Sequence, residues 1–463
     1  MHFVQFYLDC LSQASYLVGD ETTGRAVVVD PRRDVQSYLD DAAAAGLRIE
    51  RVIETHVHAD FLSGHLELAG KTGAVVSYGA GAEVDFPIEA LHDGQRLGLG
   101  DVTLDILATP GHTPESISVV IREHAADAVP FGVLTGDTMF IGDVGRPDLL
   151  SAAGVAADDL ARQLYRSIHT KLLPLPDETR VFPAHGAGSA CGKNLSTETQ
   201  STIGEQRRTN YAVQPMSEDE FVALVTEGQP LQPTYFSFDA QRNRQAHALL
   251  DEEGLPAPLT LDEVLARRDA STVVLDTRDP IDYAAGHLRG SVNVGLHGRF
   301  AELAGEVVTP DRPVVLVSDP GTELEAKVRM ARVGFDRIDG TLADPLRVLV
   351  EHPDVVEPSS RLTVREFETR RRDIPDLQIV DVRNPGETAG GAVPDAIAMP
   401  LPELASRAGE LDPTRPTVVY CASGYRSSIA ASVLAAEAFH DVSDLLGGYD
   451  AWNAAVNEEE RST

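Results

Sequence analysis

The chain has 463 residues, of which 43% are hydrophobic, and its formal net charge is −33. This length predicts about two to four domains, and the hydrophobic fraction indicates globular packing. A surface this acidic repels nucleic acid and anionic membranes, so both are excluded as partners. The first residues lack the basic and apolar segments of a signal peptide, and no apolar run approaches the about 20 residues that cross a bilayer. We therefore expect a cytoplasmic protein.

In chain order, the first 210 residues alternate short β-branched runs with turns and small helices. Residues 26–30, 51–54 and 102–106 are predicted to be buried strands. Residues 212–258 contain several prolines, among them Pro215, Pro230, Pro233 and Pro256, and indicate a connector that includes some helix.

After the connector, one pattern occurs twice. Residues 274–280 are echoed by residues 379–385, and residues 312–318 are echoed by residues 415–421. Each copy predicts a strand, a long connection, a second strand and then a helix. A unit of about 100 residues with this order is typical of a small α/β domain with a parallel sheet. The sequence therefore predicts two tandem domains.

Three cysteines occur, Cys10, Cys191 and Cys421. They are far apart and odd in number, which argues against a disulfide framework and favours a reducing compartment. Cys10 lies beside apolar residues and is predicted to be structural, so the other two are the candidate reactive thiols.

Metal-binding side chains follow several of the predicted strands. His56, His58 and Asp60 lie within five residues, directly after the strand at 51–54. Three further candidates also follow apolar runs: His112, Asp137 and His185. Side chains at the ends of neighbouring strands can converge on one point, so the sequence predicts a metal site.

These segments resemble the metallo-β-lactamase superfamily over about residues 1–210. The superfamily's dinuclear hydrolases have a histidine where this chain has Phe61. A phenyl ring cannot coordinate a metal, so the second metal site loses a ligand. His56, His112 and Asp137 then form the set of two histidines and one carboxylate expected of non-haem iron(II), with positions left open for substrate and O2. We expect one Fe(II) per chain.

The stretch 136–148 is similar to the persulfide dioxygenase branch of that superfamily. The resemblance implies oxidation of a low-molecular-weight persulfide to sulfite and the free thiol. It also implies that His58, Asp60 and His185 fix the metal ligands from behind. Arg146 is predicted to bind an anionic part of the thiol carrier, and the alternative is a buried arginine that ties loops together.

Cys191 lies in a glycine-flanked loop at residues 188–194, which looks like the corresponding segment in the branch fused to rhodanese modules. The nearby cation Lys193, also a candidate substrate-binding residue, can favour a reactive thiolate here, which makes Cys191 a possible second catalytic thiol. The alternative is that Cys191 is a small buried hydrophobic residue.

Cys421 follows the apolar strand 418–420 and precedes the helical run 427–436. A thiol on such a loop faces backbone N–H donors and the positive end of a helix dipole, which favour a thiolate or a persulfide anion. Arg426 adds a positive charge at the same place. The segment resembles the rhodanese active loop, and it is shorter than the cysteine loop of dual-specificity phosphatases. We therefore predict that Cys421 and Arg426 are catalytic in sulfur transfer.

The middle copy differs at the decisive position, because Ser318 aligns with Cys421. Serine cannot carry a persulfide, and Asp319 and Glu323 oppose an anion there. Residues 286–293 keep another motif of the module, so this copy is predicted to be an inactive rhodanese that serves as a spacer or packing partner.

The predicted architecture is α/β throughout: a metallo-β-lactamase αββα sandwich followed by two rhodanese-like α/β domains with parallel sheets. The expected domains are 1–245 with the helical connector, the inactive module at 259–355 and the active module at 361–463. The predicted function couples persulfide oxidation to sulfur transfer to or from sulfite or thiosulfate, and the direction stays open.

Two alternatives stay open: a glyoxalase II-like zinc thioester hydrolase with rhodanese appendages, and a persulfide-sensing scaffold. The expected partners are a thiol persulfide, O2, and sulfite or thiosulfate. Glutathione, coenzyme A and a bacterial thiol sugar all stay open as the carrier. A homo-oligomer is expected, since symmetric assemblies are common.

Overall fold

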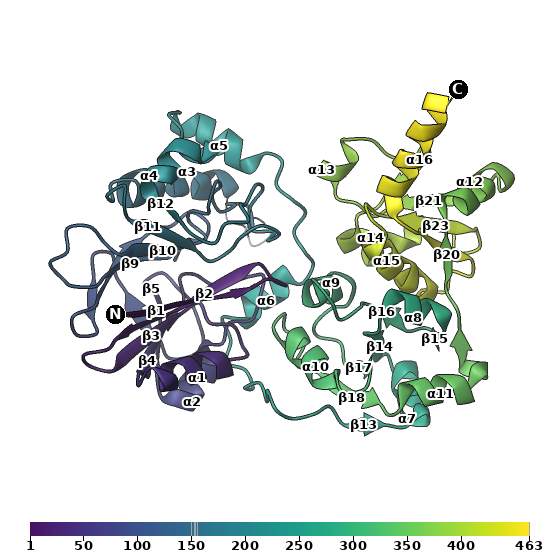
Figure 1. The fold of residues 1–463 in the computed structure, drawn as a ribbon, viewed down its shortest axis with the longest axis horizontal. Helices are drawn as coiled ribbons and strands as arrows, with labels where there is room; N and C mark the ends of the chain where they lie inside the picture. The colour runs from purple at the N-terminus through teal and green to yellow at the C-terminus, as the bar shows by residue number, and fades with distance from the viewer. Residues whose placement is uncertain (150, 152–153, 155, 463) are drawn as a thin grey trace. The chain divides into compact units, whose positions relative to one another are not determined.

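The computed structural model forms two compact units (Figure 1). The first consists of Met1–Gln232 and Phe236–Asp251, and the second of Pro233–Tyr235 and Glu252–Thr463. The structure describes residues 1–149, 151, 154 and 156–462.

The first unit contains two six-stranded sheets that pack face to face (Figure 1). Hydrophobic side chains of both sheets form the core between them, such as Tyr16 and Val18 from one and Leu104 and Ile106 from the other. The first sheet runs in the order β1 (His2–Leu8), β2 (Gln13–Asp20), β3 (Arg25–Val29), β4 (Arg48–Ile53), β5 (Val75–Gly79), β6 (Glu89–Leu91). The second runs in the order β12 (Ser201–Thr202), β11 (Arg180–Pro183), β10 (Gly132–Gly136), β9 (Ile117–Arg122), β8 (Thr103–Ala108), β7 (Arg96–Gly98).

Helices cover the outer faces of both sheets. Tyr38 and Leu68 bring two helices onto the first sheet, and Leu164 and Phe221 bring two others onto the second. These elements are α1 (Gln36–Ala44) and α2 (His65–Thr72), then α3 (Ala157–Ser167), α4 (Ile203–Thr209) and α5 (Glu218–Thr226), with short turns at Ile168–Leu172 and Tyr211–Val213. An apolar stripe on each helix therefore meets the outward apolar side of a sheet, which confirms the predicted αββα sandwich.

The second unit contains two five-stranded parallel sheets with the same strand order. The first is β13 (Pro258–Leu259), β18 (Ile338–Leu342), β17 (Val314–Val317), β14 (Val273–Asp276), β16 (Val292–Asn293). The second is β20 (Ser360–Leu362), β24 (Val442–Leu445), β23 (Thr417–Tyr420), β21 (Gln378–Asp381), β22 (Ile397–Ala398). Each strand of one sheet has a counterpart in the other, as the repeated sequence pattern predicts.

Helices and short elements complete each copy. Those of the first are α7 (Leu261–Asp269), α8 (Pro280–Ala285), α9 (Phe300–Val307), α10 (Glu323–Ala331), α11 (Pro345–Glu351), a turn at Pro353–Val355, and the pair β15 (His287–Leu288) and β19 (Val356–Glu357). Those of the second are α12 (Val364–Asp373), α13 (Pro385–Thr388), α14 (Leu401–Arg407), a turn at Ala408–Glu410, α15 (Tyr425–Ala436) and α16 (Gly448–Ser462). In the described part of the chain, no helix is both long and apolar enough to cross a bilayer.

The connector predicted at 212–258 is divided between the two units. It contains α5 and α6 (Phe236–Arg242), and the residues after α6 pack back onto the first unit. Thr234 instead belongs to the second unit, where its hydroxyl donates to the carbonyl of Gly305 over 3.0 Å. The domain limits at 245, 259–355 and 361–463 stay predictions.

Candidate metal centre and sulfur-transfer loop

Three buried side chains converge where the strands of the first unit end. His56 follows β4, His112 follows β8, and Asp137 directly follows β10. The Nε2 atoms of His56 and His112 lie 3.8 and 3.6 Å from Oδ2 of Asp137. The geometry therefore brings the three predicted metal ligands together.

The protonation states of these side chains suit a cation. Burial lowers the pKa of both histidines, which are therefore neutral, as metal ligands must be. Burial alone would raise the pKa of Asp137, but His185, His56 and His112 hold it below its usual value. Within the described residues, Oδ2 of Asp137 has no hydrogen-bond partner. A buried, unbonded carboxylate oxygen facing two neutral imidazoles fits a bound metal ion.

Each candidate ligand is held from behind by a hydrogen bond. Nδ1 of His185 lies 2.8 Å from Oδ1 of Asp137, which leaves Oδ2 for the metal. Nδ1 of His112 lies 2.9 Å from the carbonyl oxygen of Arg146. Nδ1 of His56 lies 3.0 Å from the hydroxyl of Thr55. Such partners fix the ring orientation and the tautomer of a metal-binding histidine.

Thr55 in turn depends on Asp30, which sequence reasoning did not select. The carboxylate of Asp30 accepts the backbone N–H of Thr55 over 2.7 Å and its hydroxyl over 2.9 Å. Asp30 follows β3 at the same edge of the sheet as the metal loop. The rule that strand ends gather functional side chains could have found it.

His58 also belongs to the residues that lie behind the candidate ligands. Its Nε2 lies 3.1 Å from Asp30 and 3.4 Å from Glu54. Burial alone lowers the pKa of His58, but these two carboxylates outweigh it and raise the pKa to about 10. A histidine that is protonated at neutral pH is a poor metal ligand, so this arrangement favours the predicted supporting role.

Phe61 occupies the place where the dinuclear relatives have a histidine. Its ring is completely buried and lies 4.4 Å from the ring of His58, centroid to centroid. Asn243, from the segment after α6, donates to the carbonyl oxygens of His58 and Phe61, each over 2.8 Å. The connector therefore clamps the metal loop, a contact that no local sequence pattern predicts.

Cys191 lies beside the metal ligands, with its thiol near Asp60 and His185. Nε2 of His185 also lies 2.7 Å from Asp60, so this histidine bridges Asp60 and Asp137. Cys191 is buried, and burial together with the two aspartates raises the pKa of its thiol. These surroundings favour a protonated thiol, which is the less reactive form, and its predicted role as a second catalytic thiol stays untested.

The two predicted substrate-binding cations have protein partners. The guanidinium of Arg146 pairs with Asp148 over 2.7 Å and donates to the carbonyl of Ala190 over 3.1 Å. The ammonium of Lys193 donates to the carbonyl of Leu224 over 2.6 Å, at the end of α5. Both side chains tie loops together in this structure, so their binding of a thiol carrier remains a prediction.

In the second unit, Cys421 follows β23 and precedes α15. The amide of Gly424 lies 3.2 Å from Sγ of Cys421, and the hydroxyl of Ser427 lies 3.6 Å from it. Gly424 has a φ of 99°, a left-handed conformation that favours glycine. The loop therefore presents a backbone donor to the sulfur, which suits a sulfur anion.

Arg426 is predicted to add charge at Cys421. Its guanidinium makes two hydrogen bonds, of 2.8 and 2.6 Å, to the carboxylate of Glu387 in α13. Glu387 therefore orients Arg426 and offsets part of its charge, a partner that sequence reasoning did not identify.

The corresponding loop of the middle copy has a hydrogen bond between its own residues. The amide of Gly321, the counterpart of Gly424, donates to the carboxylate of Glu323 over 2.8 Å. The hydroxyl of Ser318 accepts from Thr277 over 2.8 Å. A side chain of the loop thus occupies the donor that would face a sulfur, in agreement with an inactive module.

Both units match known protein families. Residues 8–185 match the metallo-beta-lactamase superfamily, and residues 260–339 and 363–455 match the rhodanese-like domain. The mitochondrial persulfide dioxygenase ETHE1 of Bos taurus is 30% identical over 237 residues, which cover 50% of this chain and 82% of that protein. The human protein of the same name is 31% identical over 219 residues, covering 46% of this chain and 75% of that protein.

Among solved structures, a metallo-beta-lactamase from Staphylococcus aureus subsp. aureus COL is similar, with 34% identity and a TM-score of 0.66. The alignment covers 73% of this chain and 98% of that chain. The fold and the site thus define a metallo-β-lactamase-type metal-binding domain joined to tandem rhodanese-like domains. This chain belongs to the metallo-beta-lactamase superfamily, within the family of the persulfide dioxygenases.

A first prediction concerns Asp30. In Asp30→Asn the side chain keeps its size but loses the charge that balances His58 and receives both donors of Thr55. We expect the affinity for the metal to fall about 10- to 100-fold, the usual cost of losing an outer partner of a ligand. Metal retention against a graded series of chelator concentrations measures this. Asp41→Asn, which alters a carboxylate bonded to His2, is the control. Equal metal retention in both variants would show that Asp30 does not support His56.

Proposed function

We propose that this chain is a bifunctional sulfur-metabolism enzyme. In this proposal, the first unit oxidises a low-molecular-weight persulfide to sulfite and thiol, and Cys421 transfers sulfur to or from sulfite or thiosulfate. The observation that carries it is the convergence of His56 and His112 on the unbonded oxygen of Asp137, in a chain that also holds Cys421 on an amide-lined loop.

The metal that fits best is iron(II), held by the two histidines and the aspartate. Bound iron(II) with this ligand set would supply open coordination positions for the persulfide and O2. The chain's own residues orient the ligands: His185 holds Asp137, and the carbonyl of Arg146 holds His112. The three side chains that would hold the metal are themselves buried.

Sulfur transfer would proceed through a persulfide on Cys421. Its thiolate attacks the outer sulfur of R–S–SH, the S–S bond of that persulfide breaks, and the thiolate R–S⁻ leaves. The cysteine persulfide gives its proton to R–S⁻. Sulfite then attacks the outer sulfur, which yields thiosulfate and restores the Cys421 thiolate. The amide of Gly424 and the cation of Arg426 face the negative charge that moves along this path.

A zinc thioester hydrolase is the alternative with a structural argument behind it, since Asp60, His185 and Cys191 also lie close together. However, both ring nitrogens of His185 are engaged by Asp137 and Asp60, and Phe61 supplies no ligand. The deciding experiment is oxygen uptake with persulfides of glutathione, coenzyme A and a bacterial thiol sugar, with sulfite and thiosulfate both quantified. Thioester hydrolysis without oxygen uptake would refute our proposal.

The metal content gives a second prediction. Because Phe61 removes one ligand of a second site, we expect about one iron per chain and not two zinc ions. Elemental analysis of protein produced with both metals available measures this directly. A fully active enzyme that contains two zinc ions and no iron would contradict the iron-dependent function.

A further inference from the structure

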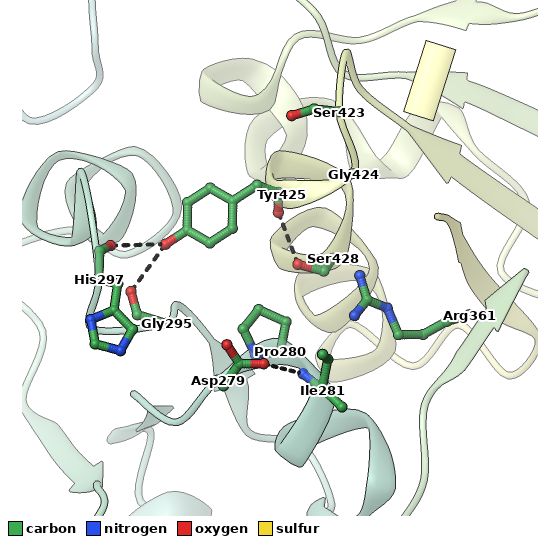
Figure 2. Close-up of a pocket in the computed structure, with 10 residues that line it drawn as sticks. All are labelled: Asp279, Pro280, Ile281, Gly295, His297, Arg361, Ser423, Gly424, Tyr425 and Ser428. Carbon is green, nitrogen blue, oxygen red and sulfur yellow. Dashed lines mark hydrogen bonds between the residues drawn. The ribbon is translucent and has the colours of Figure 1, made fainter. Parts of the chain in front are cut away.

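The inactive middle module is bonded to the transfer loop of the active one. The hydroxyl of Tyr425, the first residue of α15, donates to the carbonyl of Gly295 over 3.0 Å and lies 3.4 Å from that of His297 (Figure 2). Two helical turns further on, the hydroxyl of Ser432 accepts the backbone N–H of Asn293 over 2.9 Å. One segment of the middle module, 293–297, therefore holds the first turns of α15 at two points.

Tyr425 stands between the amide donor to the sulfur and the charged residue of the transfer loop. Gly424 before it places its amide 3.2 Å from Sγ of Cys421, and Arg426 after it carries the guanidinium of the loop. A shift of the Tyr425 backbone must move both neighbours, because peptide bonds join them directly. Burial raises the pKa of Tyr425 to about 12, so its hydroxyl keeps the proton that it donates.

Packing does not fix Tyr425 by itself. A pocket of about 270 Å³ opens beside its ring, between Pro280 and Ile281 of the middle module, Ser423 of the loop and Ser428 of α15 (Figure 2). This space is open to solvent and Tyr425 is only partly buried, so neighbouring side chains do not enclose the ring on this side. The hydrogen bonds to Gly295 and His297 then decide where the ring lies.

We propose that Tyr425 is a positioning residue, through which the inactive module sets the arrangement of the Gly424 amide and Arg426 around Cys421. The middle module, in this view, is a working part of the transfer site although it carries no sulfur. The proposal rests on the proposed sulfur transfer at Cys421, but the contact that it describes can be measured without that activity.

The test uses Tyr425→Phe in the full chain, which removes only the hydroxyl. Transfer is measured with thiosulfate as donor and cyanide as acceptor, and we expect kcat and kcat/KM to fall together by about 10-fold, because small displacements of catalytic groups are costly. Hydrogen exchange by mass spectrometry is expected to quicken several-fold in the peptide 421–428, but not in peptides from β14 or β21.

The matched control is Tyr283→Phe. Tyr283 is a buried tyrosine of the middle module whose hydroxyl also donates to a backbone carbonyl, that of Ser291 over 2.7 Å, without reaching the loop. The Tyr283→Phe substitution removes the same kind of hydrogen bond, so it should lower the stability of the fold without changing sulfur transfer or hydrogen exchange at 421–428. Ser318→Ala should likewise change neither.

Each outcome decides one of the two ideas. If the wild type transfers no sulfur while Tyr425→Phe still quickens exchange at 421–428, the positioning contact stands and the proposed transfer function fails. If exchange at 421–428 is unchanged in Tyr425→Phe, or quickens equally in all peptides, the positioning proposal is wrong. The positioning proposal is also wrong if the wild type is active and Tyr425→Phe shows faster local exchange but transfers sulfur at the wild-type rate.

Discussion

His112→Ala is expected to abolish metal binding and oxygen consumption, with a loss of activity of at least about 100-fold. The imidazole is one of the three proposed ligands, and alanine leaves Asp137 facing a single histidine, so we expect the set no longer to hold an ion. Sulfur transfer at Cys421 should remain measurable, because that residue belongs to the other compact unit. Elemental analysis, an oxygen electrode and a thiosulfate–cyanide assay on one preparation check the three statements.

His124→Ala is the matched control, since this histidine is exposed. It should keep its metal and both activities. Retention of about one metal ion per chain and of oxygen uptake in His112→Ala would show that the ligand set is wrong. Loss of sulfur transfer along with oxygen uptake would instead show that the two units do not function separately.

The fold and the convergence of the three candidate ligands could be predicted because they follow from local patterns. The β-branched runs near Val28, Val52 and Leu104 each lie in a strand, and polar residues placed directly after such runs meet at one edge of a sandwich. His56, His112 and Asp137 converge for this reason. The repeat of Asp276 and Arg278 in Asp381 and Arg383 recurs in space, since each aspartate makes a buried ion pair with its arginine.

The rest of the site could not be predicted, because it depends on contacts between distant segments. Asn243 reaches back to Phe61 across 182 positions, and the carbonyl of Arg146, not its charged side chain, bonds His112. Because every residue has a backbone carbonyl, the residue type does not reveal which carbonyl accepts a hydrogen bond. The same holds for Tyr425, whose partners are two carbonyls more than 125 positions away.

The middle module shows how a lost cysteine changes a loop. In the active copy the amide of Gly424 points to Sγ of Cys421, whereas the exposed amide of Gly321 in the middle copy has a different acceptor. Glu323 supplies that acceptor from the same loop. Glu323, one of the two acidic residues that oppose a persulfide, is thus bonded within its own loop. This agrees with a structural role for the module beside Tyr425.

Cys421→Ser is expected to separate the two chemistries. Serine is close in size but forms no persulfide, so transfer to sulfite should stop, whereas the metal centre is built from another unit and should survive. With a persulfide and O2, the variant should consume oxygen and release sulfite, while the wild type should release mainly thiosulfate. Quantifying both anions over the same interval measures the change.

Two controls make this result decisive. An enzyme-free blank measures the slow direct reaction of sulfite with persulfide, and Cys10→Ser removes a thiol that belongs to the first unit and not to the transfer loop. If Cys421→Ser still forms thiosulfate at the wild-type rate above the blank, Cys421 is not the sulfur carrier. Cys191→Ser would then be the next variant, because Cys191 is the other candidate reactive thiol and lies beside Asp60 and His185.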